Sequence, residues 1–235
     1  PSTYYWLPGI KRNSSSPYEQ SGFDLPCPSG QFRSVEGGSC EAAPVGQHVP
    51  LWGSDSAIEC LAGSWQNQTG QSSCIEAIPG QYVDVNGSSS QTPCATGTWQ
   101  NQTGQTGCMN ASAGYYVGTN GSVTQTPCGL GTWNNMTGQA ACTPASPGYY
   151  VDTNGSTTQT PCDAGTYNPN SSSNSSTDCL DTPAGNYSGP GASSPTQCSP
   201  GTWQNQTGQS SCIDANPGHY ASGFGNTNET CLLYT

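Results

Sequence analysis

Aromatic and β-branched residues occur in this chain as isolated pairs, separated by stretches of glycine, serine, threonine, asparagine and glutamine. Thr98-Trp99 and Tyr115-Tyr116 are two such pairs. Residues of these types favour strands, and the Thr-Gly and Asn-Gly dipeptides between the pairs favour turns. Glycine and proline recur throughout, and no apolar stripe follows the helical period. The pattern therefore predicts short strands and hairpins with little or no helix.

The supply of large apolar side chains is too small for an ordinary core. Leucine, isoleucine, valine and phenylalanine total 24 of the 235 residues. Burial on that scale cannot offset the conformational entropy that folding removes. The 13 cysteines and the low share of charged residues, 7%, argue against an intrinsically disordered protein. The composition therefore predicts a small, disulfide-rich β fold.

Charge and hydropathy exclude two classes of partner. Three basic residues (Lys11, Arg12 and Arg33) face 14 acidic ones, and the net charge is -11. Because nucleic-acid binding needs a basic surface, we expect no nucleic-acid partner. No apolar run approaches the length of a membrane span. The chain has no initiating methionine and no signal peptide, and we interpret it as mature or partial.

The cysteines recur with a period of 34 residues through the middle of the chain. Units that start at Cys60, Cys94 and Cys128 share the pattern C-x-x-G-[ST]-W-x-N-x-T-G-Q-x-x-C, followed by an N-G-S turn and Q-T-P. Such self-similarity is typical of an elongated array in which each unit contacts only its neighbours. The predicted segments are a leader or docking segment at 1–26, a degenerate repeat at 27–59, repeats at 60–93, 94–127 and 128–161, a lengthened repeat at 162–197, a repeat at 198–230, and the start of an unfinished repeat at 231–235.

Each unit divides into two halves of 17 residues that share glycines and aromatic residues. The second half has alanine and glutamine where the first has two cysteines, as with Ala111 and Gln125 against Cys94 and Cys108. Because both cysteines are absent together, we infer that the two cysteines of one half bond to each other. The predicted pairs are Cys27–Cys40, Cys60–Cys74, Cys94–Cys108, Cys128–Cys142, Cys162–Cys179 and Cys198–Cys212.

Other interpretations of the cysteines stay open at this point. A competing scheme joins neighbouring units, for example Cys40 to Cys60, and leaves Cys27 without a partner. Spacings of 13 or more residues without a C-x-x-C motif argue against a zinc or iron–sulfur site. The odd Cys231 opens a unit whose second cysteine would lie beyond Thr235. Either the polypeptide continues, or Cys231 bonds to another chain.

Aromatic residues form two series with constant spacing. One ring lies five residues after each opening cysteine, as Trp99 does, and the other lies in the second half, as Tyr116 does, with His48 at that place in the first unit. We expect a stacked core with one ring beside each disulfide; a sugar-binding platform is the alternative. A glycine two residues before the second-half ring, such as Gly80, would let the backbone pass close to the next disulfide.

Thirteen N-x-S/T sequons recur largely at fixed positions of the repeat. These tripeptides can simply be turns, but acceptor asparagines also lie on exposed turns, so both interpretations can hold. We expect most of them to carry N-linked glycan. The asparagines are Asn13, Asn67, Asn86, Asn101, Asn110, Asn120, Asn135, Asn154, Asn170, Asn174, Asn186, Asn205 and Asn228.

The pattern C-x-x-G-T-[WY]-x-N-x-T-G-x-x-x-C-x-x-A-x-P-G-Y-Y is similar to the ephrin-receptor-like cysteine-rich repeats, which are related in style to EGF-like modules. The resemblance covers roughly residues 27–231. It implies an extracellular eukaryotic glycoprotein, including surface and mastigoneme-type proteins, with a structural or adhesive role. The family's C-x-x-C-P-x-G-x-Y motif departs here at its second cysteine, which is replaced by Ala43, Ala77, Ala111, Ala145, Thr182 and Ala215.

Catalytic and metal-binding chemistry is not expected. The two histidines, His48 and His219, replace or flank a repeat aromatic, and no nucleophile triad, phosphate loop or H-E-x-x-H motif is present. Asp84 and Asp152 precede N-G turns, but one carboxylate in a repeat does not make a calcium cage. We therefore predict that the protein is not an enzyme and needs no cofactor.

The N-terminal segment differs from the repeats. Tyr4, Tyr5, Trp6 and Leu7 form the most apolar patch in the chain, close to the basic pair Lys11-Arg12. This segment is either a leader or cap, or a docking segment for the C-terminal end of a neighbouring copy. Head-to-tail contacts that do not close build filaments.

We therefore predict a structural subunit of an extracellular, heavily glycosylated filament or surface coat whose partner is the protein itself. The expected location is secreted or on a cell-surface appendage of a eukaryote. The alternative is an adhesin or receptor ectodomain that binds a protein or glycan ligand.

Overall fold

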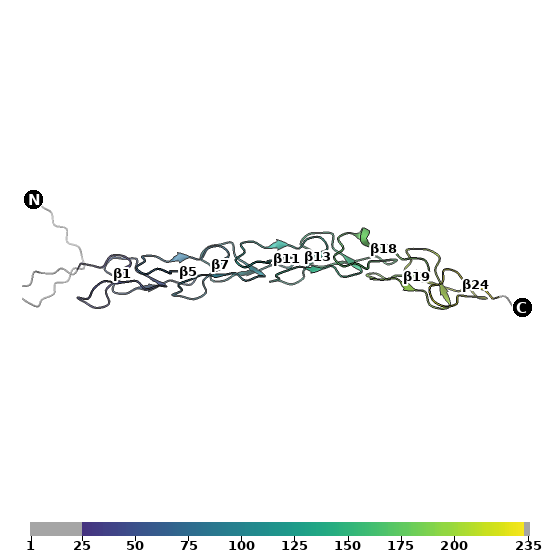
Figure 1. Ribbon diagram of the computed structural model, residues 1–235, viewed down its shortest axis with the longest axis horizontal. Helices are drawn as coiled ribbons and strands as arrows, with labels where there is room; N and C mark the ends of the chain where they lie inside the picture. Colours follow the sequence, from purple (N-terminus) through teal and green to yellow (C-terminus); the bar gives the residue numbers. More distant parts are fainter. Residues whose placement is uncertain (1–24, 233–235) are drawn as a thin grey trace, which may run out of the picture. The chain divides into compact units, whose positions relative to one another are not determined.

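The structure, a computed structural model, describes residues 25–232 (Figure 1). Within this range nearly all regular structure consists of two-residue β-strands, and there is no α-helix. A single 3-10 helix, η1, spans Ser176–Asp178. No helix of the described range has the length and apolar character of a membrane span. These features confirm the predicted disulfide-rich β fold built from repeated hairpins.

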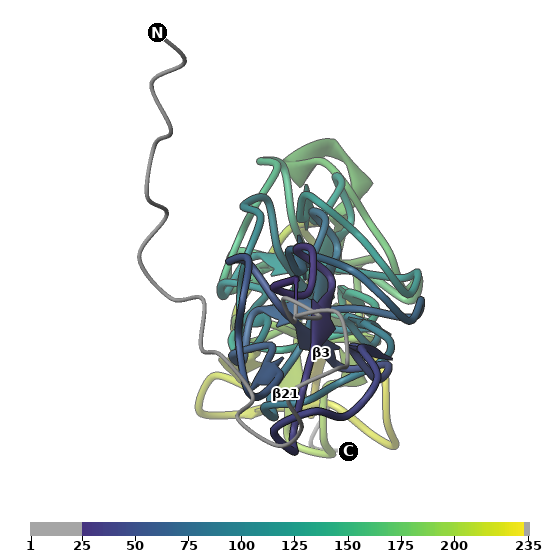
Figure 2. The same ribbon diagram turned by 90° about the vertical axis from the view of Figure 1, so that its left-hand side faces the viewer.

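The strands follow one another along the whole described range (Figure 1), and Figure 2 gives the view turned by 90°, with β3 and β21 labelled. They are β1 (Gln31–Phe32), β2 (Glu41–Ala42), β3 (Gln47–His48), β4 (Ile58–Glu59), β5 (Ser64–Trp65), β6 (Ile75–Glu76), β7 (Gln81–Tyr82), β8 (Thr92–Pro93), β9 (Thr98–Trp99), β10 (Met109–Asn110), β11 (Tyr115–Tyr116), β12 (Thr126–Pro127), β13 (Thr132–Trp133), β14 (Thr143–Pro144), β15 (Tyr149–Tyr150), β16 (Thr160–Pro161), β17 (Thr166–Tyr167), β18 (Leu180–Asp181), β19 (Asn186–Tyr187), β20 (Thr196–Gln197), β21 (Thr202–Trp203), β22 (Ile213–Asp214), β23 (His219–Tyr220) and β24 (Thr230–Cys231).

Each odd-numbered strand pairs with the even-numbered strand that follows it, which makes one hairpin in each half-repeat. In the antiparallel β5–β6 pair, Ser64 lies opposite Glu76 and Trp65 opposite Ile75. The ladder is only two residues long because the backbone on either side of β5 bonds to the next half-repeat instead. The Gly63 amide donates to the Val83 carbonyl over 2.7 Å, and the Gln66 amide donates to the Ser88 carbonyl over 3.1 Å.

The described part of the chain forms two compact units, one made of residues 25–95, Trp99–Met109 and Asn120–Thr124, the other of Thr96–Thr98, Asn110–Thr119 and residues 125–232. The same backbone hydrogen bonds join successive half-repeats within each unit. In the first unit the Gly87 amide donates to the Cys60 carbonyl over 2.8 Å. In the second unit the Gly155 amide donates to the Cys128 carbonyl, also over 2.8 Å. The repeat therefore stacks through backbone bonds that every half-repeat can make.

The interior is narrow and contains small side chains, not stacked rings. Two positions are buried in most half-repeats: the opening residue and the residue six places later. Arg33 and Ala215, which occupy such positions in the first and the last described halves, are half-buried. The opening positions are Cys27, Ala43, Cys60, Ala77, Cys94, Ala111, Cys128, Ala145, Cys162, Thr182 and Cys198, and the later positions include Val49, Gln66, Val83, Gln100, Val117, Asn134, Val151, Asn168, Ser188, Gln204 and Ala221. The rings of the two periodic series are half-buried around this interior, except Tyr220, which is 43% exposed. The predicted ring core is therefore wrong: the stacked coils leave room inside for a valine or an amide only.

Glycine is required where the backbones of two half-repeats touch. A Cβ atom on Gly63 would clash with the carbonyl oxygen of Gly104, and the φ angle of Gly63 is +91°. Gly80 has the same relation to the carbonyl of Gly121. In most half-repeats the glycine before the first strand thus approaches the backbone of another glycine, not a disulfide as the sequence had indicated, whereas a Cβ atom on Gly201 or Gly218 would meet nothing within 4 Å. One such carbonyl belongs to Ser172, a non-glycine residue with a φ of +60°, which lies opposite Gly131.

Candidate functional site: closed loops and acceptor asparagines

Six disulfides close the first half of every repeat. The structure forms the six pairs inferred from the half-repeat comparison, with Cα–Cα separations of 5.6–5.8 Å. The opening cysteine, for example Cys60, is buried in the interior, and its partner, for example Cys74, is half-buried at the edge. We call these segments disulfide-closed halves. Each bond ties a loop tip back to the interior position from which the loop starts.

Three second halves are closed by a glutamine in place of the disulfide. The Oε1 atom of Gln91 accepts a hydrogen bond from the Ile78 amide over 2.9 Å. Gln125 accepts in the same way from Ser112 (2.7 Å) and Gln159 from Ser146 (2.8 Å). We call these segments glutamine-closed halves. The sequence comparison found these glutamines only as substitutes for cysteine, and their constant position in the register was the signal of this role.

The last second half uses a carboxylate for the same purpose. The two oxygens of Glu229 accept from the backbone amide of Asn216 (2.7 Å) and from its side-chain Nδ2 (2.6 Å). These two hydrogen bonds stabilise the charged form and lower the pKa of Glu229 below its usual value. Glu229 therefore closes this half with charge-assisted bonds.

Buried amide side chains hold the loops of the disulfide-closed halves from inside. Nε2 of Gln66 donates to the Ser73 carbonyl over 2.9 Å, and its Oε1 accepts from the Gln68 amide over 3.1 Å. Gln100 and Gln204 repeat both bonds in their own halves. A buried amide is costly unless it is hydrogen-bonded, and here both ends of each amide have partners.

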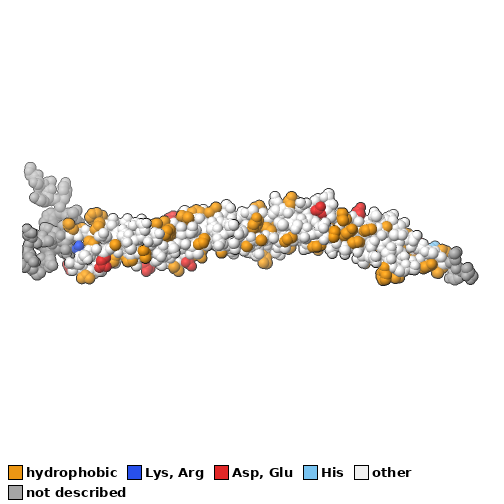
Figure 3. Space-filling view, in the orientation of Figure 1, with side chains coloured by type: hydrophobic (Ala, Val, Ile, Leu, Met, Phe, Trp, Pro, Cys, Tyr) orange, Lys and Arg blue, Asp and Glu red, His pale blue; other side chains and the backbone are white. Residues whose placement is uncertain are grey.

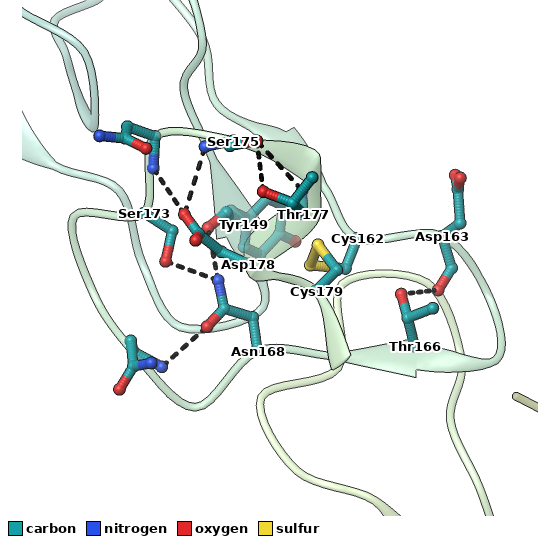
Figure 4. The surroundings of a disulfide bond; sticks show 12 residues. Tyr149, Cys162, Asp163, Thr166, Asn168, Ser173, Ser175, Thr177, Asp178 and Cys179 are labelled. Atoms are coloured by element: carbon teal, nitrogen blue, oxygen red, sulfur yellow. Dashed lines mark hydrogen bonds between the residues drawn. A yellow bond between two sulfur atoms is a disulfide. The ribbon is translucent and has the colours of Figure 1, made fainter. Parts of the chain in front are cut away.

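The lengthened repeat keeps the same plan in spite of its insertion (Figure 4). Cys162 and Cys179 are 17 residues apart, against 13 or 14 in the other five pairs. The buried Asn168 donates from Nδ2 to the Ser173 hydroxyl over 2.7 Å. The extra residues fold into η1, where an Asp178 oxygen accepts from the amides of Asn174 (3.0 Å) and Ser175 (3.2 Å). The insertion is therefore absorbed outside the interior by a locally capped turn.

The sequon asparagines lie on exposed loops with few exceptions. Of the 13, Asn13 lies outside the described residues. Eleven of the other twelve are exposed: Asn67, Asn86, Asn101, Asn110, Asn120, Asn135, Asn154, Asn170, Asn174, Asn205 and Asn228. Asn86 shows how an acceptor can also stabilise the stack, because its Oδ1 accepts from the Ala62 amide over 2.8 Å. The Nδ2 atom, to which glycan attaches, is the other atom of that amide.

Asn186 is the described sequon asparagine that is not exposed; Asn110 also lies in a strand, β10, but is exposed. Asn186 lies in strand β19 and is half-buried, and its Nδ2 donates to the carbonyls of Pro183 (3.4 Å) and Ala184 (3.1 Å). Ser188, which completes the tripeptide, is buried in the interior. A glycan on Asn186 would therefore compete with the hairpin itself.

Cys231 is free and exposed at the end of strand β24. The backbone register places Leu232, one residue later, at the opening position, because the Leu232 amide donates to the Gly218 carbonyl over 2.8 Å as the Cys94 amide does to Gly80. The spacing had predicted that Cys231 itself opens the next unit. The register moves that boundary by one residue and leaves the Cys231 thiol on the strand.

The remaining candidate residues lie in different parts of the chain. His48, Cys60 and Cys74 lie close enough to hold a metal ion, but both sulfurs belong to the Cys60–Cys74 disulfide and are not free thiolates. Asp84 and Asp152 are exposed. The docking residues Tyr4, Tyr5, Trp6 and Leu7 lie outside the described residues.

Comparison with protein-family models and with curated proteins found no match to this chain. The repeats and their closed loops therefore define the class of protein: a cysteine-rich, disulfide-bonded β-repeat protein. The six disulfides indicate an oxidising, secretory or extracellular environment, where such bonds persist.

Proposed function

We propose that this protein is a structural subunit of an extracellular, N-glycosylated filament or surface coat. One observation carries the proposal: each repeat is closed covalently in one half, and the loops around it expose acceptor asparagines at matching positions. Covalent loops resist unfolding where little apolar surface is available. A dense coat of glycan would protect the exposed polar loops (Figure 3).

The likeness to ephrin-receptor-like repeats supports this role and defines the variant. The positions that carry that family's second cysteine are here Ala77, Ala111 and Ala145, which are buried in the interior. The glutamine bonds take over the closure in these halves. We infer a variant of the family's repeat that has fewer disulfides and alternates covalent with hydrogen-bonded closure. The protein that contains it would be a mastigoneme-type or similar surface glycoprotein.

The proposal predicts a secreted protein that loses mass on enzymatic removal of N-glycans and forms regular fibres. Expression in a eukaryotic secretory host, followed by peptide-N-glycosidase treatment, mass spectrometry and negative-stain electron microscopy, tests both parts. A glycosylated protein that stays monomeric at all concentrations would reject the filament role. A secreted protein that carries no N-glycan would reject the coat.

A second candidate, a binding ectodomain, is favoured by one feature of the surface. The second strand of several first halves exposes an apolar side chain at the same register, as Ile75 (43%), Met109 (42%) and Ile213 (45%) do. Such positions could contact a ligand along one strand of each hairpin. Substituting these three residues by serine would abolish ligand binding by an ectodomain and leave the length of a filament unchanged.

A further inference from the structure

We propose that the loop around Trp52 in one copy of the chain packs against the loop around Phe224 in another copy. The inference rests on the proposed assembly and assigns its contact. The Trp52 loop comprises residues 50–54 and the Phe224 loop residues 222–226. Trp52 is 69% exposed and Phe224 is 68% exposed.

Trp52 and Phe224 occupy equivalent positions of the repeat. Asn86, Asn120 and Asn154 each lie nine residues after the alanine that opens a second half, and each begins an N-G-S sequon. Counting nine residues from Ala43 and from Ala215 reaches Trp52 and Phe224. The repeat therefore places an exposed aromatic ring, in two halves, where three other halves have a glycan acceptor.

The backbone does not require an aromatic residue in place of asparagine at this position, because the turn is the same with asparagine and with an aromatic residue. In each of these turns the next residue is a glycine whose amide donates over 2.8 Å to the carbonyl of an opening cysteine. These glycines are Gly53, Gly87, Gly155 and Gly225. Ser54 and Ser88 also make the same hydroxyl bond, over 2.9 Å, to the carbonyl three residues earlier. Asparagine would therefore fit at position 52. An exposed tryptophan at that position places apolar surface in water, which is unfavourable, and does not stabilise the turn.

Charge limits where two copies of the chain can meet. The protein has a net charge of -11, so two copies repel one another over most of their surfaces. The Trp52 and Phe224 loops contain no charged residue, and the position of Asp84 and Asp152 is occupied there by Pro50 and Ser222. Two such loops can meet without bringing carboxylates together. Glycans at Asn86, Asn120 and Asn154 would hinder contact at the equivalent loops.

The chemistry of the two rings suits a contact between unlike surfaces. Tryptophan is enriched among the residues that dominate binding energy at interfaces, and pairs of aromatic rings pack in offset or edge-to-face geometry. Because one loop belongs to an early repeat and the other to a late one, the contact joins two different patches. A contact of this kind repeats from copy to copy and produces a filament.

Trp52→Asn is the most direct test, because it creates the sequon N-G-S already present at Asn86. The variant should fold, and a glycan at position 52 would block the contact. We expect sedimentation velocity of the secreted protein to show assembly at least tenfold weaker than in the wild type. Trp52→Phe, which keeps an aromatic ring and adds no sequon, is the matched control and should assemble within twofold of the wild type. Unchanged assembly with glycan verified at position 52 by mass spectrometry would overturn the proposal.

Two charged substitutions test the pairing itself. Trp52→Glu and Phe224→Lys should each abolish self-association alone, and an equimolar mixture of the two variants should form mixed pairs, because the Phe224→Lys copy keeps Trp52 and the Trp52→Glu copy keeps Phe224. Absence of mixed pairs, or a Phe224→Lys variant that assembles normally, would overturn the pairing. The second result would assign the Trp52 loop to another occupant, such as the N-terminal segment or a foreign ligand.

The filament role and the Trp52–Phe224 contact can be rejected separately. If the wild-type glycoprotein does not assemble at all, the filament role fails and this inference fails with it. If the wild type assembles and the Trp52 and Phe224 variants assemble equally well, only the contact assigned here is wrong.

Discussion

The disulfide-closed half that begins at Cys128 and the glutamine-closed half that begins at Ala145 have the same hairpin and the same backbone bonds, but different interiors. The first buries Asn134 six residues after its opening position, and the second buries Val151 there. The same contrast separates Gln66 from Val83. A covalent bond thus accompanies a polar interior residue, and a hydrogen bond accompanies an apolar one.

The contrast shows how a chain so poor in large apolar residues distributes its stability. A disulfide that closes a loop of this length contributes about 3 kcal/mol, whereas a net hydrogen bond contributes about 1 kcal/mol. Burial of a valine side chain adds about 1.5 kcal/mol or more. The weaker closure is therefore combined with the stronger apolar burial, which brings the two kinds of half closer in stability than their closures alone would.

Removing one disulfide should have the largest effect. Cys128→Ala with Cys142→Ala leaves the hairpin sequence intact and should destabilise that half by about 3 kcal/mol, because its unfolded loop regains conformational freedom. Hydrogen exchange with mass spectrometry should show lost protection at 128–144 and in adjoining halves, since repeats unfold locally. Unchanged exchange in this segment would contradict the view that sulfur bridges hold the fold.

The reverse exchange should stabilise a glutamine-closed half. Ala145→Cys with Gln159→Cys copies the spacing of the natural pairs, and we expect a gain of about 2 kcal/mol, the disulfide less the lost hydrogen bond. Urea denaturation of oxidised and reduced samples measures it. The two single-cysteine variants are the controls and should show no gain. Failure of the pair to oxidise would mean that the halves are not interchangeable.

Deleting one closing hydrogen bond should have a smaller effect. Gln159→Ala leaves the Ser146 amide without its side-chain acceptor and should destabilise the half by about 1 kcal/mol. Gln159→Glu keeps an acceptor, as Glu229 does naturally, and should retain most of the stability near neutral pH. Amide exchange at Ser146 reports the bond directly. Equal exchange rates in the alanine variant and the wild type would show that the glutamine bond does not contribute.

The smallest effect should be a pH dependence confined to the last half. The hydrogen bonds from Asn216 lower the pKa of Glu229 in the folded protein, so the folded state binds a proton less readily than the unfolded state does. This contribution is present above the ordinary glutamate pKa of about 4.3 and is lost as the pH falls through the lowered value. Glu229→Gln should remove the pH dependence of exchange at Asn216. The same acid dependence in that variant would assign it to another group.

Much of this architecture was predictable because the chain contains repeats, so that equivalent positions in different repeats can be compared with one another. The paired absence of cysteines at Ala111 and Gln125 identified which cysteines bond, without any structural information. The short strands followed from isolated pairs such as Tyr115-Tyr116 between turn residues. The interior was not predictable in the same way. Large rings such as Trp65 suggested a core, but backbone bonds between coils bring the chain so close together that only small or linear side chains fit inside.

The amino-acid sequence by itself determined the period and the positions of the turns and favoured the observed disulfide pairs over a competing scheme, because each depends on residues near one another in the chain or on exact repetition. Only the tertiary structure decided what the glutamines do, which glycines touch, and that Leu232 and not Cys231 takes the opening position. These features depend on contacts between coils, where the backbone of one half-repeat meets residues from another. Spacing along the chain carries no direct record of such distances in space.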